Sequence, residues 1–474
     1  MEKALNYYKN NIKAVNEKLK KLEKVLIYFS ILRFIIAILC VGIMYYFYKQ
    51  SSIEAMGASF LVFLLTFIIV AFFHNERINK KKKLLIILEY NEKGIKRLDN
   101  TWREFKDIGE EFINKKHKFS NDLDLFGKSS LFQWINLTKT SFGRKNLANK
   151  MMMNSLPTRY DIQEEQEAIK ELSNKREFCE KIYFEASIEN KKKENIEELL
   201  KWLDKDEKSN FTIKYISYLF IAITFIMIFL TITRKVSISN LILDLIINYL
   251  VIKLLTKRLS DVISIFINNK KEIYKYSNML SIIQDENFKS KKLLSIQKGL
   301  VSSNINCKNE MKKLKNIISW LGDSTSNAYY LIVNVLFMSD IFILANLEEW
   351  KVKNGYKVRK WLDDMGEIEA LISLSTIAFE HDEWTYPTIS GVNEIEAIEL
   401  AHPLLGEKAK SNNFTLKGRE KVALITGSNM SGKSTFLRTI GFNMILTYLG
   451  LPTFSKGFKC GISNIYTCMR TQDN

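Results

Sequence analysis

Two long runs of apolar residues near the start of the chain predict a pair of membrane-crossing helices. The first run covers residues 25–48 and is interrupted only by Arg33, while the second covers residues 55–73 without any charge. A helix of either length crosses a bilayer core of roughly 30 Å. The link at residues 49–54 is short, so a transmembrane hairpin is expected. A hairpin buried in a soluble core is the alternative, but runs this long and apolar are rarely soluble.

Positive charges flank this hairpin and predict its orientation. Lys20, Lys21 and Lys24 precede the first span, and Arg77 and the lysines of residues 80–83 follow the second. Since cytoplasmic flanks carry an excess of Lys and Arg, both ends are expected in the cytoplasm, with the tip outside. These lysines could hold DNA phosphates, but lipid head groups explain them better beside a membrane span. The predicted location is the cell membrane.

A second apolar hairpin is predicted in the middle of the chain, with spans at residues 215–233 and 236–252. Arg234 and Lys235 mark its tip, and the returning span contains Asp244. An aspartate within a span either gates a pathway or, more commonly, contacts a neighbouring helix. A further apolar stretch at residues 329–344 contains Asn334 and Asp340. A fifth crossing would carry the rest of the chain outside the cell, so this stretch is expected to be a buried helix.

The remaining pattern predicts a mainly α protein in five parts. Residues 1–24 form a cytoplasmic helix, residues 25–73 the first hairpin, and residues 74–120 a charged helical stalk. Residues 121–385 form a long helical body into which the second hairpin is inserted. A sequence pattern typical of strands and turns begins only at Tyr386 and Pro387. Residues 386–474 are therefore expected to start an α/β domain.

The net charge and the cysteine and histidine positions say less about binding partners and metal sites than the hydrophobic pattern says about the fold. The net charge of +18 fits a nucleic acid or an anionic membrane surface, or simply a lysine-rich background. The five cysteines form no C-x-x-C pair, and the four histidines show no metal-ligand spacing. A metal site built from protein ligands alone is therefore not expected.

A glycine-rich motif near the end of the chain carries the clearest chemistry. Residues 427–434 fit the phosphate-binding pattern G-x-x-x-x-G-K-[ST]. Residues 422–426 before it predict a buried strand, and a helical pattern follows Thr435. Main-chain amides of such a loop, together with a helix N-terminus, attract phosphate oxygens. The alternative is a chance Gly/Ser turn before a helix.

This motif predicts an ATP site with magnesium. Lys433 would reach the terminal phosphates, and the Ser434 hydroxyl would bind Mg²⁺, which makes these two the candidate catalytic residues. The candidate nucleotide-binding residues are Gly427, Ser428, Asn429, Met430, Ser431, Gly432, Lys433, Ser434 and Thr435.

The residues around this loop resemble the MutS family of DNA mismatch-sensing ATPases, which are related to ABC-type ATPases. The Asn429–Met430 pair and Arg438 are not required by a generic phosphate-binding loop, and both fit the family form. His402-Pro403-Leu404-Leu405 resembles the family's element at the entry to its ATPase domain. Residues 369–374 and Tyr386–Pro387 resemble its last core helix and the strand after it.

The resemblance extends upstream into the helical body. Residues 122–127, residues 140–147, Leu156–Pro157 and Gln166 are similar to the start of the family's helical core. The resemblance implies a long-helix core and lever body followed by the start of a P-loop ATPase domain, with ATP-driven homodimerisation and mismatched or branched DNA as the ligand.

The chain also departs from the family pattern in three ways. Membrane hairpins stand where the mismatch-reading domain and the DNA clamp are expected. Beyond Thr435 the only acidic side chain is Asp473, so the family's magnesium-binding and water-orienting carboxylates are not found, and ATP hydrolysis is left open. The family's adenine-stacking aromatic residue falls near Ala409–Lys410, with Phe414 several positions away.

Three functions are compatible with these features. The first is a membrane-anchored, MutS-like ATP-binding switch that acts on DNA. The second is a membrane-embedded switch with the same nucleotide-binding core and no role on DNA. An ABC-type transporter is the least favoured, because four spans are few for a substrate pathway.

Overall fold

The computed structural model describes residues 1–188, 196–205, 212–256, 260–302, 305–319, 328–418, 422–428 and 431–469. Asn429, Met430 and Asp473 therefore lie outside the described residues. The fold is mainly helical, with one four-stranded mixed sheet. The chain divides into two compact units. The first contains Met1–Asn136, Met151–Phe184 and Ser373–Asn474, and the second contains Leu137–Lys150 and Glu185–Ile372.

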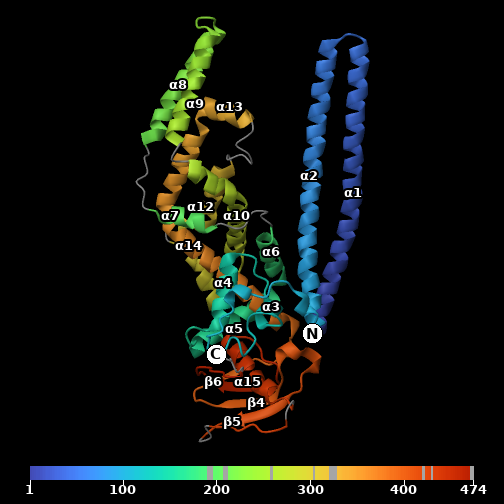
Figure 1. Cartoon of the computed structure of the whole chain (residues 1–474), viewed down its shortest axis with the longest axis vertical. Helices are drawn as coiled ribbons and strands as arrows, with labels where there is room; N and C mark the ends of the chain where they lie inside the picture. The colour runs from blue at the N-terminus through green and yellow to red at the C-terminus, as the bar shows by residue number, and fades with distance from the viewer. Residues whose placement is uncertain are drawn as a thin grey trace. The chain divides into compact units, whose positions relative to one another are not determined.

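The first unit begins with a long antiparallel helical hairpin, α1 (Glu2–Lys49) and α2 (Ile53–Leu98), drawn in blue in Figure 1. Each helix contains an 18-residue stretch that is long and apolar enough to cross a membrane, with mean hydropathy 2.5 in α1 and 2.6 in α2. Only 6% and 0% of these two stretches is buried. The first unit therefore does not bury these stretches, which argues against the alternative of a hairpin packed inside a soluble core.

The base of this hairpin is packed firmly, in contrast to its apolar part. The Tyr8 ring lies directly against Gly94, where no other residue type would leave room for it. Arg97 and Glu380 form an ion pair in which both side chains are about 1% exposed. Glu380 is the last residue of α14 (Ser339–Glu380), so the hairpin is fixed to the end of that helix.

The expected helical stalk of residues 74–120 is wrong beyond Leu98, where α2 ends. The chain turns at Asn100 and Gly109, whose φ angles of 63° and 65° are left-handed and interrupt a helix. Only short 3₁₀ turns follow, η1 (Trp102–Glu104) and η2 (Glu110–Phe112). The Gln133 amide donates to the carbonyls of Arg103 and Phe105, and this bonding replaces the missing helical hydrogen bonds.

Three short helices belong mainly to the first unit: α3 (Leu131–Ile135), α5 (Arg159–Asn174) and α6 (Arg176–Ala186). Helix α4 (Ser141–Met152) lies between them in the chain and belongs mainly to the second unit. In α5 the Thr158 and Asp161 side chains bond each other's main-chain N–H groups, a capping box that fixes the start of the helix.

The second unit is built from helices and one short two-stranded ribbon. Its elements are α7 (Ile196–Asp204), α8 (Thr212–Ile232), α9 (Ile238–Thr256), α10 (Ser260–Asp285), α11 (Lys291–Gly299), β1 (Val301–Ser302), β2 (Ile305–Asn306), α12 (Cys307–Ser319), α13 (Ala328–Phe337) and most of α14. The ribbon strands pair antiparallel.

Helices α8 and α9 form the second hairpin, and their polar side chains face each other. The Thr224 hydroxyl donates to Asp244 at 2.8 Å, and the Asn248 amide donates to Thr224 at 2.7 Å. Asp244 thus makes the helix–helix contact that the sequence favoured. The outward residues are apolar and exposed, for example Phe229 at 63% and Leu250 at 50%. The continuous apolar stretch of α8, Ser217–Ile232, is shorter than those of α1 and α2, and none of comparable length is found in the described part of α9. Crossing by this hairpin therefore stays a prediction.

The apolar stretch at residues 329–344 forms two helices, so the expectation of one helix is wrong. Met338 separates α13 from α14 and has a left-handed φ of 48°. The Asn334 side-chain oxygen accepts from the Asp340 main-chain N–H at 3.0 Å and caps the start of α14. The polar residues within the stretch thus mark its break. Met338, Ile341 and Leu344 are buried, as expected for a buried helical segment.

The last part of the first unit is a small sheet packed against one helix. The strands are β3 (Thr388–Ser390), β4 (Ile395–Leu400), β5 (Asn412–Leu416) and β6 (Gly457–Gly461), in the order β3-β6-β4-β5. Strand β3 is parallel to β6, and the other pairs are antiparallel. Helix α15 (Lys433–Tyr448) packs its apolar face on this sheet in one core with Ile162 of α5. The first strand of this sheet begins at Thr388, close to Tyr386 and Pro387, while the short ribbon β1–β2 precedes it in the chain.

Candidate functional site

The glycine-rich loop leads into the N-terminus of α15. Gly432 is the residue before the helix and has φ 90° and ψ 11°, a left-handed conformation that favours glycine. The Phe436 main-chain N–H donates to the Gly432 carbonyl at 2.9 Å and forms the first helical bond. The helix therefore starts at Lys433, slightly before the position after Thr435 where its sequence pattern predicts it. Main-chain N–H groups of its first turn have no partner within the helix and can donate hydrogen bonds to an anion.

The Lys433 side chain folds back over the loop. Its Nζ donates to the carbonyls of Gly427 at 2.8 Å and Ser428 at 2.6 Å. The Ser431 main-chain N–H donates to the Ser428 carbonyl at 3.3 Å, which closes the loop on itself. Ser434 and Thr435 are exposed. The structure thus brings Gly427 and Ser428 to the Lys433 ammonium group. Ser431, Gly432, Lys433 and Thr435 line one cavity, and Ser434 is not among its lining residues.

The segment before the loop is not the buried strand that its sequence predicts. Residues 422–428 form no regular secondary structure, and Val422 and Leu424 are 84% and 87% exposed. An apolar, β-branched run becomes a strand only when another strand takes its hydrogen bonds. The four-stranded sheet of the described residues ends at β5 and does not extend to this segment.

A cavity of about 490 Å³ lies over the loop. Its lining carries the ammonium groups of Lys408, Lys410 and Lys433 and the side chains of Asn412 and Asn413. No Asp or Glu is among the described residues that line it. The size is within the range of ligand pockets, and the charge favours an anion. The other lining residues are His402, Leu405, Ile425, Thr426, Ser431, Gly432, Thr435, Phe436 and Thr439.

Sequence reasoning missed the two lysines at positions 408 and 410. Lys408 is the last residue of the 3₁₀ segment η3 (Pro403–Lys408), and Lys410 follows it by two positions. In a chain with 70 Lys and Arg residues, two more loop lysines gave no distinguishing signal. Lys410 lies in the cavity lining at the place where the family aligns its adenine-stacking aromatic residue. Phe414 instead packs edge-on against Phe436, with ring centres 5.7 Å apart.

His402 forms part of the cavity wall and is 8% exposed. Burial, and then the nearby Arg438 charge, lowers the pKa of its imidazole to about 4. Its ring packs against Phe442 at 5.0 Å between centres. A neutral, buried ring packed in this way supports the wall of the cavity.

Helix α15 is fixed in place by Asn443, which is completely buried. The Asn443 amide donates to the Ala401 carbonyl at 3.1 Å, and its side-chain oxygen accepts from the Phe454 main-chain N–H at 3.2 Å. The Phe454 ring stacks on Trp384, with centres 4.9 Å apart. This set of contacts joins α15 to the segment that follows α14.

The segment of residues 122–127 packs on the same helix. Arg438 donates to the Asp124 carboxylate at 3.3 Å, and Leu123 packs against Gly441. The Asp122 carboxylate accepts from the Met469 main-chain N–H at 3.1 Å. The upstream segment whose sequence resembles the start of the family core thus holds the helix that carries Lys433.

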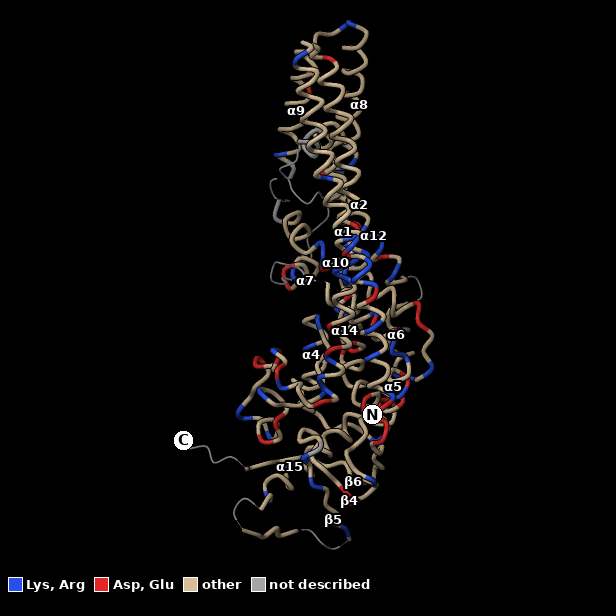
Figure 2. Tube along the Cα trace, turned by 90° about the vertical axis from the view of Figure 1, so that its right-hand side faces the viewer, with Lys and Arg blue, Asp and Glu red and all other residues tan. Residues whose placement is uncertain are grey.

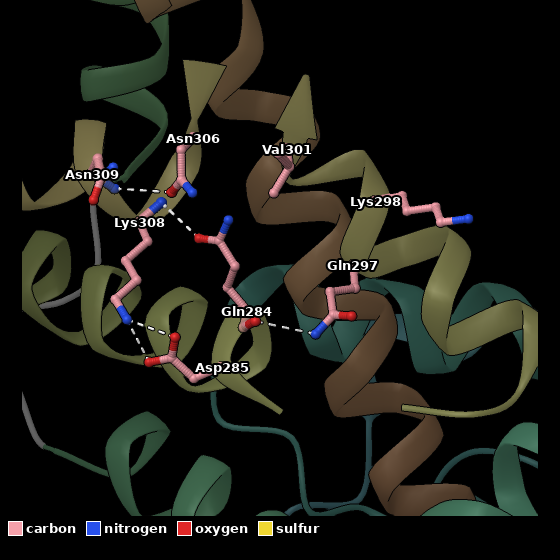
Figure 3. Close-up of a pocket in the computed structure, with 8 residues that line it drawn as sticks. All are labelled: Gln284, Asp285, Gln297, Lys298, Val301, Asn306, Lys308 and Asn309. Carbon is pink, nitrogen blue, oxygen red and sulfur yellow. Dashed lines mark hydrogen bonds and ion pairs between the residues drawn. The ribbon is translucent and has the colours of Figure 1, made fainter. Parts of the chain in front are cut away.

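A second cavity, of about 600 Å³, lies in the second unit between α10, α11 and α12 (Figure 3). Its polar groups bond one another. Gln297 donates to main-chain carbonyls at the end of α10, and the two oxygens of Asp285 each accept from Lys308 at 2.6 Å. These contacts link the ends of the helices, and this structural role accounts for the polar side chains that line the cavity.

Nothing in the described residues forms a group of three or more His, Cys, Asp or Glu side chains that could hold a metal. The predicted metal ligand, the Ser434 hydroxyl, is exposed in the first turn of α15. A metal that arrives with a nucleotide would take its remaining ligands from phosphate and water.

The first unit thus combines a small mixed sheet with a glycine-rich loop at the start of α15. Curated relatives support a MutS-like class of protein. The chain is 32% identical over 145 residues to MutS protein homolog 5 of Caenorhabditis elegans, which is 29% of this chain and 10% of that protein. It is 35% identical over 109 residues to the DNA mismatch repair protein MutS of Persephonella marina, and 31% identical over 109 residues to the endonuclease MutS2 of Carboxydothermus hydrogenoformans.

These matches are partial. They cover 22% of this chain and 12% of the Persephonella protein, and 23% of this chain and 14% of the Carboxydothermus protein. The chain thus matches about a tenth to a seventh of the length of these relatives. No family model matches the chain. The similarity supports a MutS-like protein related to mismatch-repair ATPases over part of its length.

Proposed function

We propose that this protein is a membrane-anchored, MutS-like ATP-binding switch that acts on mismatched or branched double-stranded DNA. The observation that supports it most directly is the cavity over the loop. A glycine-rich turn, a helix N-terminus and three lysines face one space whose described lining contains no carboxylate. This chemistry suits a triphosphate.

ATP with Mg²⁺ fits these residues, because the nucleotide supplies the negative charge that the lining lacks. Lys433 would exchange the carbonyls of Gly427 and Ser428 for phosphate oxygens. Main-chain amides of residues 431–435 would donate to the phosphates, and the Ser434 hydroxyl would bind the metal. Asn429 and Met430 belong to the same proposed loop by sequence. Hydrolysis would require a carboxylate from outside the described lining.

The experiment for nucleotide binding compares the parent chain with Lys433→Ala in detergent, using a fluorescent ATP analogue with Mg²⁺. Loss of the one ammonium that faces the phosphates is expected to weaken binding by about 100-fold or more. Lys417→Ala is the matched control, because Lys417 is exposed and does not line the cavity. Equal affinity of Lys433→Ala and the control would refute the site.

Membrane anchoring is supported by the length, composition and exposure of the apolar stretches in α1 and α2. We infer a multi-pass protein in the cell membrane with its nucleotide loop in the cytoplasm. In a cysteine-free background, a membrane-impermeant thiol reagent should label Ser51→Cys in intact cells and label Lys417→Cys only after permeabilisation. Labelling of both, or only of Lys417→Cys, in intact cells would contradict this topology.

DNA as the ligand is supported by the similarity to mismatch-repair proteins and by the net charge of +18. Homodimerisation driven by ATP would bring two copies together on DNA. Binding of a mismatched duplex by the solubilised protein should weaken linearly with the logarithm of salt concentration, and the slope counts the phosphates contacted. Absence of binding even at low salt would remove DNA from the proposal.

The exposed hairpin α8–α9 favours a second candidate, a membrane switch that does not act on DNA. Its apolar residues face outward and its polar residues face inward, as in a lipid-embedded helix pair. Nucleotide-dependent cross-linking between cysteines placed at the two hairpin tips would support this candidate. Unchanged cross-linking together with DNA binding would favour the first.

A further inference from the structure

The contacts between α1 and α2 fix which residues of the two helices lie at the same level. The Asn11 amide donates to Asn91 at 3.2 Å near the base of the hairpin. Further along, Lys81 pairs with Glu23 at 2.8 Å, and Arg33 bonds His74 at 3.2 Å. Residue numbers thus rise along α1 while those of the neighbouring residues on α2 fall, as in an antiparallel helix pair.

This register shows that the apolar parts of the two helices end at different levels. The apolar run of α1 begins at residue 25, while that of α2 ends at residue 73. Residues 25–32 therefore lie beside residues 75–80, which are mostly polar and include Arg77 and Lys80. Eight residues of helix correspond to about 12 Å along the hairpin axis. We call residues 20–32 of α1 and 74–83 of α2 the collar.

The collar presents apolar and cationic side chains at neighbouring levels. On α1, Ile27, Tyr28 and Ile31 are 60%, 74% and 51% exposed. On α2, Lys80 and Lys82 are exposed beside residues 22–25 of α1, just below these apolar side chains. In Figure 2 the upper parts of the hairpins are almost free of charged residues, and blue and red segments gather below them. This combination matches the region of a bilayer where acyl chains meet head groups.

The collar carries far more positive than negative charge. Its cations are Lys20, Lys21, Lys24, Arg77, Lys80, Lys81, Lys82 and Lys83, against Glu23 and Glu76. Among the residues that the structure describes, Lys81–Glu23 is the one ion pair within the collar. Lys83 lies over the Phe184 ring at 5.5 Å. The exposed Lys20, Lys21, Lys24, Lys80 and Lys82 have no acidic partner among those residues.

We propose that the collar is a binding surface for the head groups of anionic phospholipids. The proposal rests on the membrane anchoring proposed above and adds lipid selectivity to it. A nucleic acid would satisfy the lysines and leave Ile27, Tyr28 and Ile31 in water, whereas a bilayer interface accommodates both sets. Each lysine near an anionic surface is worth about fivefold in binding constant.

The experiment reconstitutes the full chain in vesicles of equal phosphatidylcholine and phosphatidylglycerol, extracts it gently, and measures the co-purified lipids by mass spectrometry. Phosphatidylglycerol should be enriched several-fold over the bulk, and added salt should reduce the enrichment. Replacement of Lys20, Lys24, Lys80 and Lys82 by Gln should abolish it. The matched control replaces Lys106, Lys115, Lys116 and Lys128, which are also exposed lysines of the first unit, and should retain it.

The outcomes separate this inference from the anchoring on which it rests. Release of the parent chain from the vesicles by alkaline carbonate would overturn both. Carbonate-resistant insertion without enrichment, or equal enrichment in the collar and control variants, would overturn the inference and leave the anchoring intact. Loss of duplex DNA binding in the collar variant with unchanged phosphatidylglycerol enrichment would assign the lysines to nucleic acid and overturn it as well.

Discussion

The buried ion pair at the base of the first hairpin provides the sharpest test of how that hairpin is held. The Glu380 carboxylate accepts from Arg97 Nη2 at 2.7 Å and Nε at 2.9 Å, and from the Tyr8 hydroxyl at 2.8 Å. Arg176 lies in the same cluster, over the Phe379 ring at 4.6 Å. Glu380→Gln therefore leaves the Arg97 charge buried without its ionised partner.

The expected cost of Glu380→Gln is about 3–5 kcal/mol, because one charge of a buried pair remains uncompensated. For a unit of this size the cost corresponds to a fall in melting temperature on the order of 10 °C. The double variant Arg97→Met/Glu380→Leu removes both charges and should recover much of the loss. Thermal unfolding in detergent, followed by tryptophan fluorescence, measures all three proteins.

The matched control is Glu104→Gln. It breaks the ion pair between Lys96 and Glu104, which are 3.3 Å apart in the same unit. These side chains are 46% and 70% exposed, so the control should change stability by at most about 1 kcal/mol. If Glu380→Gln lowered the melting temperature no more than Glu104→Gln, the buried pair would not hold the hairpin. A double variant less stable than the single one would also contradict the reasoning.

Two further predictions concern the helix that carries the loop. Since the pKa of His402 falls to about 4 in the folded protein, its contribution to stability is complete above about pH 6.5 and decreases as pH falls towards 4, by up to about 3 kcal/mol. His402→Leu should reduce the difference in melting temperature between neutral and acidic buffer, and an unchanged difference would refute this. Asn443→Ala leaves the Ala401 carbonyl and the Phe454 N–H without their buried partner, and should cost about 2–4 kcal/mol. The same variant should weaken binding of the ATP analogue, and full stability with full binding would show that Asn443 does not hold α15.

Local signals predicted the elements that depend on local physics. The uncharged run of residues 55–73 lies within α2, and the glycine before Lys433 marks the start of α15. The polar residues Asn334 and Asp340 also carried local information. The sequence analysis placed them within one buried helix, whereas they mark the break between α13 and α14. Such a break depends on one capping contact, which hydrophobic periodicity does not report.

Features that depend on distant partners could not be predicted. Residues 422–426 have the composition of a strand, yet a strand needs a neighbour, and the described sheet does not supply one. Arg97 and Glu380 are 283 positions apart, and nothing in either local sequence shows that they meet. Lys408 and Lys410 line the cavity together with residues of α15, which is a consequence of tertiary packing.

The contacts that follow Glu380 have a mechanical consequence. Trp384 stacks on Phe454, and Thr385 pairs with Thr453 beside it. Phe454 in turn bonds Asn443 in the middle of α15. A short series of packed and hydrogen-bonded contacts therefore connects the base of the first hairpin to α15. We expect a change in the tilt of the hairpin to shift α15, so that hairpin tilt and ligand binding at the glycine-rich loop influence each other.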